Sequence, residues 1–137
     1  MNPVEILFVE DNAGDTLLVF QAVEETAAPV KFHLARDGEQ ALLMLHDKTF
    51  DADLIILDLG LPGLSGYDVL ERCGPIEIPV VVFSGSTNPA DEKRALELGV
   101  REFVQKPPGF EAYKETVRRM IKKWGLPRNG AASVAAT

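Results

Sequence analysis

Short apolar runs alternate along this chain with segments in which apolar residues recur every three or four positions. The runs that suit strands are Val4–Val9, Val30–Ala35, Leu54–Leu57, 79–84 and Glu102–Gln105. Three of them are almost wholly apolar, as expected for strands that are covered on both faces. The pattern therefore predicts a buried parallel sheet.

Helical spacing appears between these runs and after the last one. The residues expected on the apolar faces are Leu17, Phe20, Val23 and Ala27 in the first helix, Ala41, Leu42 and Leu45 in the second, and Phe110, Tyr113, Val117, Met120, Ile121 and Trp124 in the fifth. The third helix, 66–73, is short. The fourth begins near Pro89 and ends at Gly99, an arrangement typical of helix ends.

Strict alternation of strand and helix predicts an α/β fold. We expect a doubly wound, five-stranded parallel sheet with helices on both faces, joined by right-handed crossovers. No internal linker or longer repeat divides the chain, so one domain is expected over residues 1–124. The small and polar residues 125–137 are expected to form a flexible tail.

Composition and charge narrow the class of protein. The 137 residues are 46% hydrophobic and 26% charged, which is typical of a globular domain. The net charge of −7 argues against binding to nucleic acid. No apolar run is long enough to span a membrane, and no signal-peptide pattern is present. The single Cys73 allows no internal disulfide, so a cytoplasmic location is expected.

Polar residues follow four of the five predicted strands. Glu10 and Asp11 follow the first, Asp58 the third and Lys106 the fifth, while Ser84 ends the fourth. Because parallel strands end at one rim of a sheet, these side chains are expected to lie together. Three carboxylates repel one another unless a cation such as Mg²⁺ neutralises them.

This set of groups suits phosphoryl transfer, which needs positioning and charge neutralisation. A carboxylate can itself accept the phosphoryl group as an acyl phosphate. Asp58 is the expected acceptor, because its strand is central and its loop carries Gly60 and Gly63, which leave room for backbone to approach a bound group.

The motifs at these strand ends resemble those of a known family. They are VED at 9–11, LIILDLGLPGLSGYDVL at 54–70, VVVFSGS at 80–86 and FVQKP at 103–107. Together they resemble the receiver domain of two-component response regulators, over about residues 4–124. The resemblance implies the flavodoxin-like (CheY-like) strand order 2-1-3-4-5 and transfer of a phosphoryl group to Asp58 from a sensor histidine kinase.

The resemblance also implies roles for the other residues of the rim. The implied Mg²⁺ ligands are Asp11, Asp58 and the backbone carbonyl of Gly60, with Glu10 acting through water. Ser84 and Lys106 would hold phosphoryl oxygens. Ser84 and Phe103 would form the switch that changes the surface of the fourth helix, fifth strand and fifth helix. Phe103 stands where many relatives have Tyr.

The implied protein is a single-domain regulator rather than an enzyme, with slow self-dephosphorylation at most. Its partners would be a histidine kinase and a downstream protein or phosphotransfer partner. The segments 9–15 and 86–100 and a last helix ending at Trp124 resemble small regulators of phytochrome-type kinases, in which the fourth and fifth helices form a homodimer face.

Three other functions are compatible with a small α/β domain of this kind. A small Mg²⁺-dependent phosphatase would commonly carry a second Asp two residues after the nucleophile, where this chain has Gly60. A flavodoxin-like cofactor binder would not place an acidic loop at 10–15, where a phosphate would bind. A pseudo-receiver, which binds partners without phosphorylation, would not need the full set of acids, hydroxyl and lysine.

Overall fold

The computed structural model describes residues 3–27, 29–74 and 77–126. Five strands alternate with five helices in this part of the chain. In chain order they are β1 (Val4–Val9), α1 (Ala13–Glu24), β2 (Val30–Ala35), α2 (Gly38–His46), β3 (Leu54–Leu57), α3 (Gly66–Arg72), β4 (Val80–Ser84), α4 (Pro89–Glu97), β5 (Glu102–Gln105) and α5 (Phe110–Trp124).

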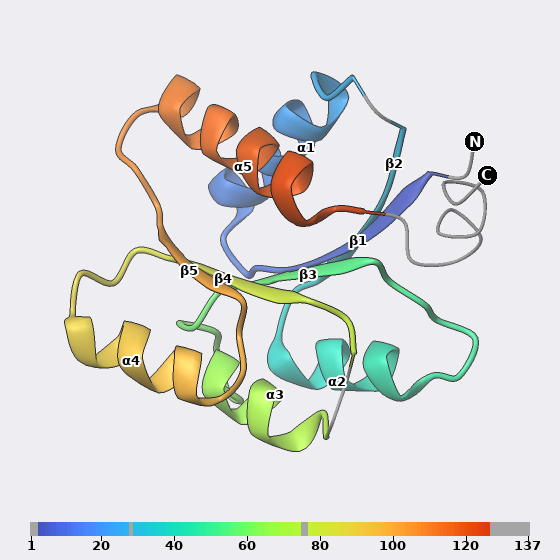
Figure 1. Ribbon diagram of the computed structural model, residues 1–137, viewed down its shortest axis with the longest axis vertical. Coiled ribbons are helices and arrows are strands. Elements are labelled where there is room, and N and C mark those ends of the chain that lie inside the picture. The colour runs from blue at the N-terminus through green and yellow to red at the C-terminus, as the bar shows by residue number, and fades with distance from the viewer. Residues whose placement is uncertain (1–2, 28, 75–76, 127–137) are drawn as a thin grey trace.

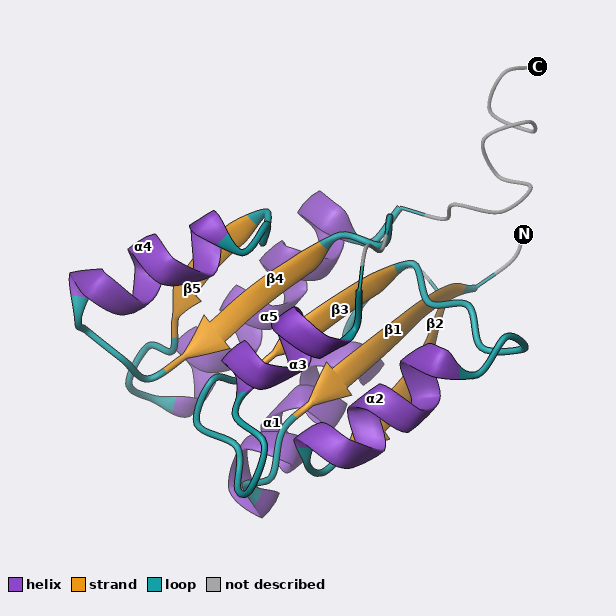
Figure 2. Ribbon diagram, turned by 90° about the horizontal axis from the view of Figure 1, so that it is seen from below, coloured by secondary structure: helices purple, strands orange, loops and turns teal. Residues whose placement is uncertain are grey.

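The strands form one sheet in the order β2-β1-β3-β4-β5, and every neighbouring pair is parallel. Helices α1 and α5 cover one face of the sheet, while α2, α3 and α4 cover the other (Figure 1). The strand arrows point the same way, so the carboxyl ends of the strands share one rim (Figure 2). The predicted doubly wound α/β fold and its strand order are confirmed.

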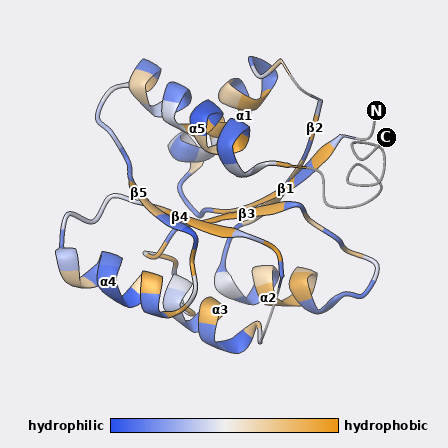
Figure 3. Ribbon diagram, in the orientation of Figure 1, coloured by the Kyte–Doolittle hydropathy of each residue, from blue (hydrophilic) through white to orange (hydrophobic). Residues whose placement is uncertain are grey.

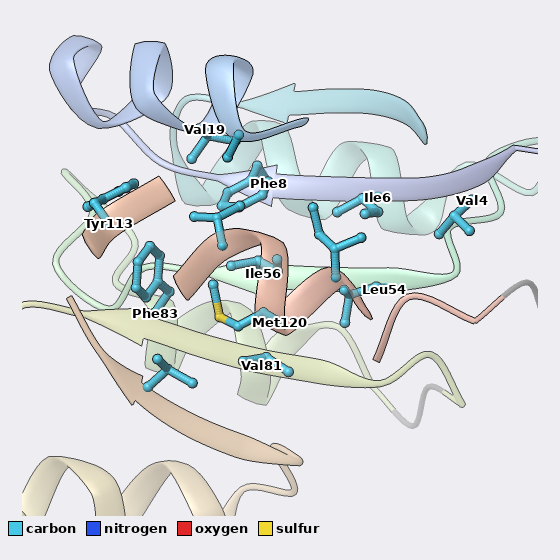
Figure 4. Packing of buried hydrophobic residues seen from close by; sticks show 14 residues of the cluster. Val4, Ile6, Phe8, Val19, Leu54, Ile56, Val81, Phe83, Tyr113 and Met120 are labelled. Carbon is cyan, nitrogen blue, oxygen red and sulfur yellow. The ribbon is translucent and has the colours of Figure 1, made fainter. Parts of the chain in front are cut away.

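The core consists of two hydrophobic clusters separated by the sheet. Successive strand residues point to opposite faces, so Ile56 packs in the cluster under α1 and α5 and Ile55 in the cluster under α2, α3 and α4. The central strands β3 and β4 are strongly hydrophobic, whereas the edge strands β2 and β5 carry polar residues (Figure 3). Figure 4 shows Phe8, Ile56, Phe83 and Met120 meeting in the first cluster.

The predicted buried face of α1 was partly wrong. Leu17 and Phe20 are 59% and 44% exposed, and α1 ends at Glu24, before Ala27. Val19 and Ala22 are the buried residues of α1. Residues 17–20 are all apolar, so spacing alone could not distinguish the inward side of this helix.

Two further predictions, on Phe110 and on the start of β4, were wrong. Phe110, expected in the core, is 75% exposed because it is the first residue of α5, ahead of the buried Tyr113 and Val117. Strand β4 begins at Val80 rather than at residue 79, since Pro79 has no N–H for the ladder, although its carbonyl accepts from Ile55.

Polar side chains begin the first four helices. Asn12, Asp37, Ser65 and Asn88 each accept a hydrogen bond from a backbone N–H of the first turn. Of the predicted tail, residues 127–137 lie outside the described residues. No helix in the described part of the chain is long and apolar enough to cross a membrane.

Candidate functional site

The ends of β1 and β3 place three carboxylates side by side at the rim. Val9 pairs with Leu57, and the Asp58 N–H donates to the Val9 carbonyl at 3.0 Å. Glu10 and Asp11 follow Val9 directly, so they lie next to Asp58. One oxygen from each carboxylate lies within 4.8 Å of the other two. The structure therefore brings together the three acids that the sequence predicted at one site.

These acids differ in their surroundings. Glu10 is 3% exposed, while Asp11 is exposed. Burial raises the pKa of Glu10 to about 7; the hydrogen bond from Lys106 opposes this change, and the charge of Asp58 adds to it. The donor set of three carboxylates fits a hard divalent cation such as Mg²⁺, which prefers oxygen ligands.

Lys106 supplies positive charge to the same site from the end of β5. Its ammonium lies 2.7 Å from Glu10, 3.0 Å from Asp15 and 3.5 Å from Asp58. Burial lowers the pKa of Lys106, but its interactions with Glu10, Asp58 and Asp15 together outweigh burial, and the pKa is raised overall. Lys106 is therefore a stable cation that partly neutralises the acids.

The backbone fixes Lys106 beside the hydroxyl at the end of β4. The Lys106 N–H donates to the Ser84 carbonyl at 2.7 Å. Ser84 is 4% exposed, and its Oγ accepts a hydrogen bond from the Ser86 N–H at 3.1 Å. The Lys106–Pro107 peptide bond is trans, as are the other peptide bonds of the described residues.

The loop after β3 contains an exposed turn, and the glycine that begins α3 lies close to the backbone of Asp58. The Gly60 N–H donates to Asp58 at 3.2 Å, and Gly63 has a φ of 69°, which favours glycine. A Cβ on Gly66 would lie 2.6 Å from the Asp58 carbonyl oxygen. The absence of a side chain at Gly66 thus lets α3 begin directly against the backbone that carries Asp58.

Phe103, the predicted switch residue, lies in β5. Its side chain is partly buried and packs against the cluster under α2, α3 and α4. It therefore lies on the face of the sheet that carries α4, and its role in switching is a prediction.

Sequence reasoning missed two residues next to the acids. Asp15 lies in the first turn of α1, which Asn12 caps, and its carboxylate contacts Lys106 at 3.0 Å. The Tyr113 hydroxyl is buried without a hydrogen-bond partner among the described residues, and burial, followed by the charge of Asp15, raises its pKa. For Asp15, the signal available was its place in the acidic loop 10–15 that follows the first strand.

A doubly wound sheet with acids, a hydroxyl and a lysine at its carboxyl rim defines a receiver-type protein. A family model described as response regulator receiver domain matches residues 6–118. The chain therefore belongs to the response regulator receiver domain family.

Solved structures and curated proteins agree with this assignment. The chain is 30% identical to the phosphorylated cyanobacterial phytochrome response regulator RcpA, with a TM-score of 0.83 over 90% of this chain and 94% of that one. It is also 30% identical to the Mn²⁺-bound response regulator Rcp1, with a TM-score of 0.82 over 91% of this chain and 99% of that one.

Among curated proteins, it is 35% identical to the probable methanogenesis regulatory protein FilR2 of Methanothrix harundinacea, over 90% of this chain and 84% of that protein. Other relatives are longer. The chain spans 53% of the transcriptional regulatory protein CiaR of Streptococcus pneumoniae, with 31% identity over 89% of this chain. It spans 26% of a probable cyclic di-GMP phosphodiesterase of Vibrio cholerae, with 32% identity over 85% of this chain.

Proposed function

We propose that this receiver accepts a phosphoryl group on Asp58 from a sensor histidine kinase. The observation that carries the proposal is the grouping of Asp58 with Glu10 and Asp11 within 4.8 Å, and with Lys106 at 3.5 Å. A carboxylate in that position is held in place and its charge is partly neutralised by Lys106, which suits an acceptor of a phosphoryl group.

In the transfer, an Asp58 oxygen forms a bond to phosphorus while the bond from phosphorus to the kinase histidine nitrogen breaks. The imidazole leaves, and an acyl phosphate remains on Asp58. Lys106 balances the charge of the transferred oxygens, and the Ser84 hydroxyl donates a hydrogen bond to one of them.

The metal-binding residues would be Asp11, Asp58 and the Gly60 carbonyl, with Glu10 acting through water. When bound, Mg²⁺ would supply charge neutralisation at this rim. The resemblance to the receiver family and the oxygen-rich donor set support this assignment.

On this proposal the chain is a switch rather than an enzyme, with self-dephosphorylation at most. Phosphorylation would act through Ser84 and Phe103 on the surface formed by α4, β5 and α5, which would then bind a downstream protein or phosphotransfer partner, or a second copy through α4 and α5. The similarity to the response regulators RcpA and Rcp1 supports a regulator of this kind, and the similarity to RcpA, a phytochrome response regulator, supports a phytochrome-type kinase as donor. A receiver domain over residues 1–124 and a cytoplasmic location stay predictions of the sequence.

The test is the intact mass of the pure protein after incubation with Mg²⁺ and acetyl phosphate. We expect a gain of one phosphoryl group that is lost in Asp58→Asn and in a sample with excess chelator. Asp47→Asn, which changes an exposed aspartate after the end of α2, is the matched control and should be labelled like the wild type. A wild-type protein that binds Mg²⁺ but gains no mass from either acetyl phosphate or a phosphorylated histidine kinase would indicate a pseudo-receiver.

A further inference from the structure

A chain of hydrogen bonds connects Ser84 to helix α3. The Ser86 N–H donates to Ser84 Oγ at 3.1 Å, and the Ser86 hydroxyl donates to Asp91 Oδ2 at 2.5 Å. The Tyr67 hydroxyl donates to Asp91 Oδ1 at 2.6 Å. Asp91 lies in the first turn of α4 and Tyr67 in α3, so the chain spans two helices on the same face of the sheet (Figure 1).

Each hydrogen bond in this series has a defined donor and acceptor. Burial, followed by the hydrogen bond to Asp91, raises the pKa of Tyr67 to about 12, so the phenol keeps its proton. The hydrogen bonds from Ser86 and then Tyr67 lower the pKa of Asp91. Asp91 is therefore a carboxylate that accepts from both hydroxyls at neutral pH.

The hydrogen bond from the Ser86 N–H to Ser84 Oγ leaves the Ser84 hydroxyl free to act as a donor. A hydroxyl has one proton and two lone pairs, and a backbone N–H can only donate. Because Ser86 N–H uses a lone pair of Ser84 Oγ, the Ser84 proton stays available for another acceptor. Ser84 is 4% exposed at the end of β4, next to the strand that ends before Asp58.

The ring of Tyr67 is held independently of its hydroxyl. It packs against the same cluster as Phe103, and the Arg94 guanidinium lies 4.0 Å from the ring centroid. Arg94 also pairs with Glu71 at 3.4 Å, and both side chains are half exposed. The packing of the Tyr67 ring and the hydrogen bond of its hydroxyl can therefore be changed separately.

We propose that Tyr67, Asp91 and Ser86 form a positioning relay that presents the Ser84 hydroxyl as a donor to the phosphoryl group on Asp58. The inference rests on the proposed function of Asp58. It assigns to α3 and the start of α4 a part in the phosphoryl-accepting reaction, in addition to any part in binding partners.

The test compares initial rates of phosphorylation by acetyl phosphate and Mg²⁺ in a double-mutant cycle. Tyr67→Phe removes the hydroxyl and keeps the ring, and we expect it to slow labelling about fivefold, as loss of one positioning hydrogen bond would. Ser84→Ala should slow labelling at least as much, and adding Tyr67→Phe to it should cause no further loss. Asp91→Asn is the second relay variant, and the melting temperature of each variant shows that it is folded.

Arg94→Gln is the matched control, because it removes the cation over Tyr67 and the pair with Glu71 but leaves the hydroxyl relay in place. It should be labelled within about twofold of the wild-type rate. The relay is wrong if Tyr67→Phe reacts at the wild-type rate, or if its loss adds fully to that of Ser84→Ala, since a merely structural effect would add. If the wild type gains no phosphoryl group at Asp58, the proposed function itself fails.

Discussion

The acids of the rim form two groups, according to whether they pair with Lys106. Its single ammonium lies within 3.5 Å of Glu10, Asp15 and Asp58, so these three share one positive charge. Asp11 is exposed and takes part in no ion pair among the described residues. On the proposed function the acids have separable roles: Asp11 would add negative charge for a metal, whereas Asp15 pairs with Lys106.

Paired substitutions of these two aspartates should therefore have opposite effects. Asp11→Asn should weaken Mg²⁺ binding at least about tenfold and leave the unfolding free energy of the metal-free protein unchanged or slightly higher, because repulsion within the cluster falls. Asp15→Asn should lower that free energy by about 0.5–1 kcal/mol, because Lys106 loses a partly buried partner.

Mg²⁺ titration calorimetry and urea denaturation in chelator measure the two quantities. Asp15→Asn should keep its Mg²⁺ affinity within about threefold of the wild type, since a removed charge near the metal has a modest effect at this exposure. A loss of Mg²⁺ affinity in Asp15→Asn as large as that in Asp11→Asn would show that Asp15 belongs to the metal site instead.

Strand β5 and helix α5 are joined through Glu102. Its carboxylate accepts from the Trp124 indole at 2.8 Å and pairs with Lys123 at 3.3 Å and Arg119 at 3.7 Å. Burial raises the pKa of Glu102, but the hydrogen bond from Trp124 and the two cations outweigh it, so the pKa is lowered overall. The ionised form of Glu102 is therefore the one that the folded protein stabilises.

The lowered pKa of Glu102 determines how its contribution to the unfolding free energy depends on pH. A carboxyl whose pKa is lower in the folded state stabilises fully above its unfolded pKa, and the effect is lost as pH falls through the folded pKa. Glu102→Gln should cost about 0.5–1 kcal/mol of unfolding free energy at neutral pH and progressively less below about pH 4.5. Urea denaturation followed by Trp124 fluorescence at each pH measures the difference.

Glu115→Gln, a change at an exposed position of α5, is the control and should cost less than about 0.3 kcal/mol at every pH. If Glu102→Gln costs the same at pH 3 as at pH 7, its effect comes from altered packing around Trp124 and not from charge.

The sequence predicted well those elements whose pattern of apolar residues fits only one secondary structure and one buried side. The buried strands are short apolar runs, and their ends place Glu10, Asp58, Ser84 and Lys106 at one rim whatever the details of packing. Helix α1 has adjacent apolar residues on several sides, so its buried face depends on how it meets α5, which periodicity does not encode.

The contacts that the sequence could not predict join residues far apart in the chain. Tyr67 and Asp91 are 24 positions apart, and Lys106 and Asp15 are 91 apart. Lys106 was predicted at the rim, but Tyr67, Asp91 and Asp15 each look like ordinary helix residues in the sequence. Only the packing of α3 against α4, or of β5 near the start of α1, gives them a role at the site.

At the scale of the whole molecule, the sheet links two cores that do not touch one another directly. Adjacent residues of one strand, Ile55 and Ile56, are 2% and 1% exposed and pack in opposite clusters. Losing either helix layer would expose one face of a sheet that is apolar on both faces. The two layers are therefore expected to unfold together, as one cooperative unit.

Ile55→Val and Ile56→Val test this coupling, because each removes one buried methylene from a different core. Each should lower the unfolding free energy by about 1 kcal/mol. Trp124 packs against the cluster that contains Ile56, so its fluorescence reports one side of the sheet, while far-ultraviolet circular dichroism reports all helices. In a cooperative domain both signals shift to the same midpoint in both variants, including Ile55→Val, whose change lies across the sheet from Trp124.

If the Trp124 transition stays in place in Ile55→Val while the dichroism transition moves, the layers unfold separately. In that case a change at Asp58 could loosen α4 without disturbing α5, and the two helices would have to be treated as independent outputs.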